Sequence, residues 1–551
     1  MSTKLELERP FALALVEEFP RLSIWREQLK IGRRIDVSFD ALRPEELAFL
    51  EQAYARAGGE YRNRAANVAA LLAAVQSGEP RFGEHDDLER LLPALALYLS
   101  KDALRGWLFN ANVAGKALAY VVYRLDYVPA SSEEVGKILL ELRAYGRGMM
   151  MTKSVRICSS DIVNKSVPEI LASKGLLKET PALIAAYDAA AQRYFDWQSR
   201  YGSQFLAAGV GFYAEDPTSP RRESDWSRKD LIVLSTSGGP ARVVNDEGIL
   251  PAQAVAADAT GDILGPYLRK AGKSDRYSSE DEVQASRAQI PAGLFTQIPV
   301  HGYLFVFHLE LHHHLWVHVD DLAAYEYSPS LKQKLVLPPE QTDLIDILTA
   351  EMDVLMDDIV VGKSGGTTVL CSGPAGVGKT LTAEVYSEIV GRPLYRVHSG
   401  QLGLNVAAME QALKEALTRA QRWGAVMLID EADVYIKRRE DDMTMNAVVG
   451  VFLRVLEYFN GLLFLTTNRV DDIDEAIVSR CIALLRYQPP DRAGRQKIWQ
   501  VMNEQFELKL SSALIEELAE LFPEASGRDI KGLAKLVAKY CRQKKVGPTL
   551  E

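Results

Sequence analysis

The sequence has 551 residues and carries 74 Asp and Glu against 64 Lys and Arg, so its formal net charge is −10. Hydrophobic residues make up 47% and charged residues 25%, which is typical of globular proteins and excludes global disorder. The acidic balance disfavours a protein that coats nucleic acid. No apolar run reaches the roughly 18 to 20 residues of a membrane-spanning helix, and the first residues lack the apolar stretch of a signal peptide. We therefore expect a cytoplasmic protein of several domains, with no membrane segment.

Residues 1–228 are predicted to form an all-helical N-terminal domain that recruits a partner and ends in a linker. Apolar residues recur at the spacing of one helix face, for instance at Val135, Ile138, Leu139 and Leu142. The stretch 215–228 combines prolines and charges without any periodicity, which predicts a linker and a domain boundary.

Residues 229–342 are predicted to form a small β-rich domain. Short apolar runs, among them Tyr303–Leu309 and Leu315–Val319, are separated by turn residues. The segment 271–287 is polar, charged and aperiodic, so we expect it to leave the domain as an excursion.

Six of the eight histidines lie between His301 and His318. A continuous strand would place a set of polar side chains on one face, where imidazole and carboxylate groups could bind zinc. That set is His308, Glu310, His312, His314 and His318. A hairpin that bends near residues 312–314 would instead leave the histidines on an exposed side. The hairpin is favoured, and it predicts a solvated or pH-sensitive face.

Residues 343–490 are predicted to form an α/β P-loop NTPase core with a parallel sheet, and residues 491–551 a helical lid. The strand-like run Thr367–Ser372 leads into the pattern G-x-x-x-x-G-K-T and then into a helix, which is the context of a phosphate-binding loop. We expect Lys379 to reach the β- and γ-phosphates of ATP and Thr380 to hold Mg²⁺. The predicted nucleotide-binding residues are Gly373, Pro374, Ala375, Gly376, Val377, Gly378, Lys379, Thr380 and Leu381.

Two further strand ends carry polar residues suited to hydrolysis. The apolar run Ala425–Ile429 ends in Asp430, expected to hold Mg²⁺ through water, and Glu431, expected to deprotonate the attacking water. Residues 430–433 read Asp-Glu-Ala-Asp, a motif that also occurs in a large class of helicases. The residues that follow this motif argue against a helicase. Asn468 comes after another apolar run and is expected to orient the attacking water.

Two arginines complete the predicted site. Arg480 closes a short amphipathic segment and is expected to reach the γ-phosphate of a neighbouring subunit. Arg528 lies in the first turn of a predicted lid helix, from which it would fold back on the phosphates. The alternative for Arg480 is a surface arginine in an ion pair.

These residues resemble the Walker A, Walker B, sensor 1, arginine finger and sensor 2 motifs of an AAA ATPase, over roughly residue 343 to the C-terminus. More narrowly, Lys379–Glu384, Arg392–Tyr395 and Val451–Gly461 resemble a poorly characterised AAA group abundant in fungi. Members of that group also have a β-rich segment resembling Trp316–Asp320 before the core. The resemblance implies a homo-oligomer, namely a hexameric ring.

The leading hypothesis is an ATP-hydrolysing, ring-forming ATPase that remodels, assembles or disassembles a protein partner bound by residues 1–228. The alternatives are an ATP-dependent oligomeric switch or scaffold and, disfavoured by the acidic charge, a nucleic-acid motor. The region Gln401–Val406 lacks the aromatic pore residue of many unfoldases. We therefore expect inefficient threading, with force passed instead from the core through a linker at residues 338–342.

Overall fold

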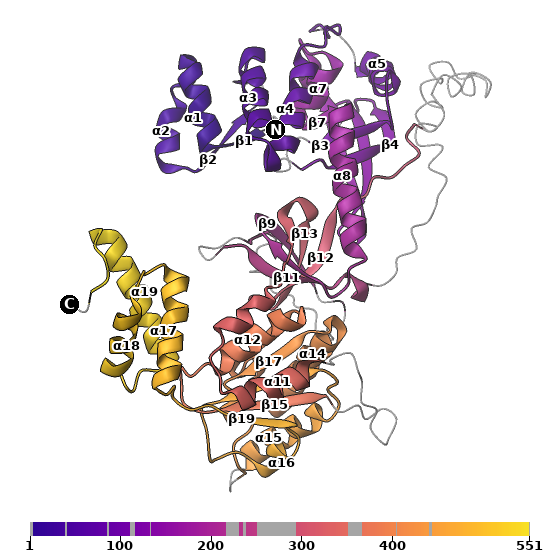
Figure 1. Ribbon diagram of the computed structural model, residues 1–551. Helices are drawn as coiled ribbons and strands as arrows, with labels where there is room; N and C mark the ends of the chain where they lie inside the picture. The colour runs from indigo at the N-terminus through magenta and orange to yellow at the C-terminus, as the bar shows by residue number, and fades with distance from the viewer. Residues whose placement is uncertain are drawn as a thin grey trace.

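The protein is seen here as a computed structural model that describes residues 4–38, 41–84, 88–110, 116–132, 134–215, 217, 231–234, 239–250, 294–350, 366–403, 405–439 and 443–549. An N-terminal unit, a central sheet and an α/β core follow one another from top to bottom in Figure 1, with the C-terminal helices beside the core. No helix within these ranges has both the length and the hydropathy to cross a bilayer.

The N-terminal unit contains both helices and antiparallel sheets. A two-stranded sheet pairs β1 with β2, and a five-stranded sheet has the order β6-β5-β4-β3-β7. Its elements are β1 (Lys4–Glu8), α1 (Arg9–Glu18), α2 (Trp25–Ile31), β2 (Arg34–Ser38), α3 (Pro44–Ala57), α4 (Arg62–Val75), α5 (Leu88–Ser100), β3 (Trp107–Asn110), β4 (Ala119–Val128), β5 (Lys137–Gly146), β6 (Met149–Cys158), α6 (Ser159–Ile162), α7 (Val167–Ser173) and β7 (Leu176–Lys178).

The prediction of an all-helical N-terminal domain is therefore wrong. The residues that suggested a helix form strand β5, in which Ile138, Leu140 and Leu142 are fully buried while the residues between them are partly exposed. Positions i and i+4 share a face in a strand as well as in a helix, so this pair of positions does not distinguish the two structures. Val135 precedes the strand and is 71% exposed.

Helix α8 (Pro181–Gln198) leads from the N-terminal unit into the central sheet. Its first half buries Leu183, Ile184 and Tyr187 in the core of the N-terminal unit. Its second half buries Ala190 and Tyr194 in the core of the central sheet. One helix thus belongs to two hydrophobic cores (Figure 1).

The central sheet has seven strands in the order β10-β9-β13-β12-β11-β8-β14, all paired antiparallel. Strands β8 and β9 come before the predicted linker, so the predicted boundary at residue 228 divides strands of a single sheet. Most of that linker and the predicted excursion 271–287 lie outside the described residues. The strands are β8 (Gln204–Ala207), β9 (Val210–Ala214), β10 (Leu231–Val233), β11 (Ala241–Asn245), β12 (Tyr303–His308), β13 (His313–His318) and β14 (Leu322–Ala324).

All of the histidines between residues 301 and 318 except His301 lie on the predicted hairpin, formed by β12 and β13, but it bends at residues 309–312 and not at 312–314. The predicted exposed histidine face is wrong, because His301, His308, His314 and His318 are each at most 4% exposed. Burial lowers the pKa of His301 to about 4 and that of His318 well below its usual value. Within the described ranges, no group of three or more His, Cys, Asp or Glu residues is arranged to hold a metal ion.

The α/β core is a five-stranded parallel sheet in the order β16-β17-β18-β15-β19, followed by three C-terminal helices, as predicted. The expected linker at residues 338–342 is instead the start of helix α11. The elements are α11 (Pro339–Ala350), β15 (Thr367–Ser372), α12 (Lys379–Val390), β16 (Leu394–His398), α13 (Ser399–Leu402), α14 (Val406–Trp423), β17 (Val426–Asp430), α15 (Met443–Leu456), β18 (Leu462–Thr467), α16 (Glu475–Val478), β19 (Ala483–Arg486), α17 (Arg492–Phe506), α18 (Ser512–Leu521) and α19 (Gly527–Lys544).

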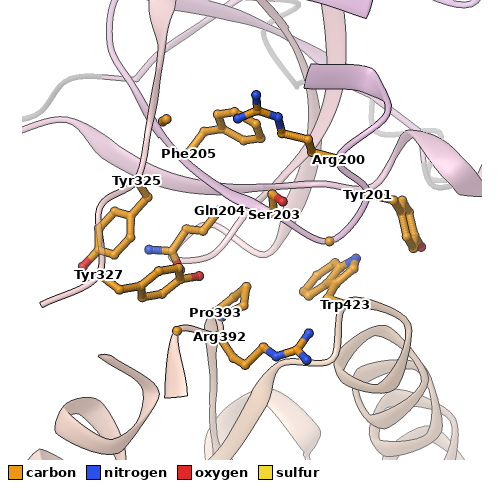
Figure 2. Close-up of a pocket in the computed structure, with 13 residues that line it drawn as sticks. Arg200, Tyr201, Ser203, Gln204, Phe205, Tyr325, Tyr327, Arg392, Pro393 and Trp423 are labelled. Atoms are coloured by element: carbon orange, nitrogen blue, oxygen red, sulfur yellow. The ribbon is translucent and has the colours of Figure 1, made fainter. Parts of the chain in front are cut away.

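The central sheet packs directly on the α/β core. Phe307 of β12 meets Tyr395 and Trp423 of the core, with ring centroids 5.6 and 5.1 Å apart. Beside this contact lies a cavity of about 210 Å³. Figure 2 shows Arg392, Pro393 and Trp423 reaching it from the core, opposite Gln204 and Phe205 of β8.

Next to the cavity, the carboxylate of Asp246 joins the two units. Asp246 is fully buried and follows strand β11. It accepts hydrogen bonds from Arg422 Nη2 (2.9 Å) and Trp423 Nε1 (2.8 Å) at the end of α14. From its own unit it is contacted by the Tyr201 hydroxyl (2.8 Å) and by His314 Nε2 (2.9 Å). The central sheet is therefore fixed to the core by side-chain contacts.

Candidate active site

The phosphate-binding loop connects β15 to α12. Gly373, Gly376 and Gly378 have φ values of 144°, 82° and 102°, a region that side chains rarely adopt. A Cβ atom on Gly376 would also lie 2.7 Å from Ser526 Oγ, and one on Gly373 would clash with the carbonyl oxygen of Tyr487. The backbone conformation therefore favours glycine at all three positions, and the space around the loop additionally requires it at Gly373 and Gly376.

Lys379 lies over this loop at the start of α12. Its Nζ donates to the carbonyl oxygens of Gly373 (2.7 Å) and Pro374 (2.6 Å) and to Asn468 Oδ1 (3.0 Å). Lys379 is only 8% exposed, and this burial lowers its pKa. Lys379 and Asn468, which the sequence places 89 positions apart, thus meet in one site.

Asp430 ends strand β17 beside Thr380. Its Oδ1 accepts hydrogen bonds from Thr380 Oγ1 (3.0 Å) and Thr466 Oγ1 (2.5 Å), and its Oδ2 pairs with Arg396 Nη2 at 2.5 Å. Burial opposes ionisation, but the Thr466 hydrogen bond and the Arg396 charge together hold the pKa of Asp430 below its usual value. A hydroxyl beside an ionised carboxylate is a donor set that suits Mg²⁺.

Glu431 follows at once and begins a short turn in the left-handed conformation, with φ of 56°. Its backbone N–H donates to Thr466 Oγ1 at 3.0 Å, and the residue is exposed. Asp433, to which the sequence assigned no role, accepts from the backbone N–H of Asn468 (3.0 Å) and from the Thr467 hydroxyl. The ends of β17 and β18 are thereby tied together.

The C-terminal helices reach the loop through α19. Ser526 caps this helix, and the backbone N–H of Arg528 in its first turn donates to the carbonyl oxygen of Gly376 at 3.2 Å. The Arg528 charge is close enough to contribute to the lowered pKa of Lys379, after burial. The lid and the phosphate-binding loop are therefore in direct contact.

Arg480 lies elsewhere, after α16. Its Nη2 pairs with Glu457 Oε1 at 2.5 Å and its Nη1 donates to the carbonyl oxygen of Ala476. Its side chain is 34% exposed. The structure thus groups Lys379, Thr380, Asp430, Asn468 and Arg528 but places Arg480 in a surface ion pair.

Comparison with known proteins agrees with this geometry. Residues 369–487 match the family described as "ATPase family associated with various cellular activities (AAA)". The chain contains an AAA ATPase domain. The matched stretch of this AAA domain begins within β15 and ends after β19, so it includes the phosphate-binding loop, Glu431 and Asn468. The domain is that of an ATP hydrolase.

Several named proteins are similar to about a third of this chain. ATP-dependent zinc metalloprotease FtsH 1 of Symbiobacterium thermophilum is 30% identical over 196 residues, or 32% of this chain and 33% of that protein. A proteasome-activating nucleotidase of Pyrococcus abyssi is 29% identical over 193 residues, or 32% of this chain and 47% of its own length. The AAA-domain protein therefore spans less than half of either relative.

A solved structure also matches. It is a HORMA:CdnC:Trip13 complex of E. coli MS115-1, with 21% identity and a TM-score of 0.32 over 40% of this chain and 93% of the other.

Proposed function

We propose that this chain is an ATP-hydrolysing, ring-forming AAA ATPase that remodels, assembles or disassembles a protein partner. The observation that carries the proposal is the meeting of Lys379, Thr380, Asp430 and Asn468 at the carboxyl ends of three parallel strands. Thr380 and Asp430 would hold Mg²⁺, whose charge offsets that of the phosphates. Lys379 would bind the β- and γ-phosphates, and Asn468 would orient the water from which Glu431 takes a proton.

The surroundings of Arg480 support assembly. Near it in sequence, Tyr458 is 68%, Ile482 58% and Val478 37% exposed. Exposed apolar groups mark contact surfaces between proteins, and a head-to-tail contact closes into a ring when its rotation fits. We propose that a second copy of the chain packs here, in a ring of six. Arg480 would then break its ion pair with Glu457 and contact the γ-phosphate of the ATP bound to that copy.

The contact at Asp246 supports mechanical coupling. Helix α14 begins at Val406, the last residue of the region 401–406, and ends at Arg422 and Trp423, which both donate to Asp246. A nucleotide-dependent movement of α14 would therefore displace the central sheet and, through α8, the N-terminal unit. We propose that the N-terminal unit binds the partner. Leu404 of the predicted pore region lies outside the described residues.

The type of partner is argued from the relatives. Their names refer to a metalloprotease and to the proteasome, which favours a protein partner. The narrower resemblance of Arg392–Tyr395 and Val451–Gly461 to the AAA group abundant in fungi supports a ring with a β-rich domain before the core.

The proposal is tested with the full chain and its Glu431→Gln variant. We expect the variant to form hexamers with ATP in analytical ultracentrifugation, and a protein retained by it to stimulate ATP turnover of the parental chain. Absence of ATP turnover would contradict the proposal. ATP-dependent assembly with slow turnover that no retained protein stimulates would favour the switch or scaffold instead.

A further inference from the structure

Arg396 occupies the side of Asp430 that Thr380 and Thr466 leave open. It lies on β16, the edge strand next to β17, and its Nη2 is 2.5 Å from Asp430 Oδ2. Asp430 is 5% exposed, so the pair forms where water screens charge poorly. A charge-assisted hydrogen bond of this length is among the stronger side-chain contacts.

A second carboxylate lies within reach of the same arginine. Arg396 Nη1 is 3.9 Å from Glu384 Oε1 on helix α12. The Arg396 side chain is 39% exposed and its Nε has no hydrogen-bond partner among the described residues. The guanidinium is therefore held by one short contact, and a small rotation would exchange Asp430 for Glu384.

This arrangement has an electrostatic consequence for Asp430. The carboxylate already accepts two hydroxyl hydrogen bonds on Oδ1, so Arg396 uses its remaining oxygen. Mg²⁺ bound through Asp430 and Thr380 would need that same negative charge. A guanidinium cation at this distance repels a divalent cation and competes with it for the carboxylate.

We propose that Arg396 is a built-in counter-ion of the Mg²⁺ site, which pairs with Asp430 before Mg·ATP binds and shifts to Glu384 afterwards. The inference rests on the proposed ATPase function and adds a regulation to it. Arg396 sets how much Mg²⁺ the protein needs in order to bind nucleotide. It is a positioning residue, since it acts through Asp430.

The test measures nucleotide binding and not turnover. In the Glu431→Gln background, binding of a fluorescent ATP analogue is titrated with Mg²⁺. Arg396→Gln is expected to lower the Mg²⁺ concentration at half-saturation about three- to tenfold, since a competing charge is removed. Glu384→Gln is expected to raise it, because Arg396 then loses its alternative partner. Arg396→Lys should lie closer to the parental value.

A matched control is Arg454→Gln, which removes an exposed arginine paired with Glu410 on the same domain and should leave the Mg²⁺ requirement unchanged. An unchanged or higher requirement in Arg396→Gln, with parental melting temperature, would overturn the inference. If the parental background binds no nucleotide at any Mg²⁺ concentration, the proposed ATPase function itself fails. The two failures are therefore distinguishable.

Discussion

Two five-stranded sheets of this chain use their strands in opposite ways. In the parallel sheet of the AAA domain, chemistry gathers at the strand ends, where β15 leads to Lys379, β17 ends at Asp430 and β18 is followed by Asn468. In the antiparallel N-terminal sheet, the ten-residue strands β4, β5 and β6 are paired along their length, and β5 alternates buried and partly exposed residues. The first sheet brings together the groups proposed to act on ATP, whereas the second supplies a buried face. Substitutions should therefore affect rate in one and stability in the other.

The largest expected effect concerns Arg480. If Arg480 acts as proposed, Arg480→Ala should lower the rate of ATP hydrolysis by about 10³- to 10⁵-fold, the range known for arginine fingers, with little change in nucleotide affinity. Its loss from a surface ion pair should cost less than about 1 kcal/mol of stability. Steady-state hydrolysis and thermal melting measure the two effects.

The control mixes Arg480→Ala with Lys379→Ala subunits. An intact pocket beside an intact arginine should restore part of the activity. No restoration, after subunit exchange has been demonstrated, would mean that Arg480 does not act on the neighbouring subunit.

The second prediction concerns Glu431, which directly follows strand β17. Glu431→Gln should reduce hydrolysis by about 10²- to 10⁴-fold while ATP stays bound, because the group that is removed is the proposed base and not a proposed phosphate ligand. Lys379→Ala should remove nucleotide binding itself. Equilibrium binding and single-turnover hydrolysis separate the two steps, and parental turnover in Glu431→Gln would refute the role of Glu431.

Substitutions at two neighbouring residues of β5 test whether the antiparallel sheet contributes stability through its buried face. Leu140→Ala should destabilise the protein by about 2 to 5 kcal/mol, since Leu140 is fully buried, whereas Leu139→Ala on the other face should cost clearly less. Urea unfolding measures both values. Equal losses would contradict the alternation, and a fall in basal ATP hydrolysis of the folded variants would contradict the division of roles.

The smallest effect is a pH dependence of stability. Burial lowers the pKa of His301 and of His312 to about 4 in the folded protein. The unfolded chain therefore binds more protons between about pH 6.5 and 4, and stability falls as the pH falls through that window. Each of the two histidines should lower the free energy of unfolding by about 1 kcal/mol at pH 5.5 relative to pH 7.5.

Melting curves at both pH values for the parental protein and for His312→Phe test this expectation. The variant should lose less stability on acidification. An equal loss would mean that His312 titrates normally.

The sequence predicted the structure best where the type and position of the residues are compatible with a single local structure. The glycines and Lys379 follow an apolar run, as a phosphate-binding loop requires, and the sheet, lid and first-turn position of Arg528 could be predicted from local order. The N-terminal sheet could not, because spacings such as that of Ile138 and Leu142 fit a strand and a helix equally well. Arg396 and Asp246 gave no local signal. Asp430 lies 34 positions from Arg396, and the partners of Asp246 in the core lie 176 and 177 positions from it, so only the tertiary fold brings them together.

Helix α8 has a consequence for how the molecule comes apart. Because its two halves complete two different cores, the N-terminal unit and the central sheet cannot lose their structure independently without leaving half of this helix unsupported. Amide hydrogens from Leu183 to Tyr194 should therefore exchange as slowly as the more stable of the two units. A cut within α8 would expose apolar side chains on both fragments, so this chain is poorly suited to dissection at the helix that joins its two units.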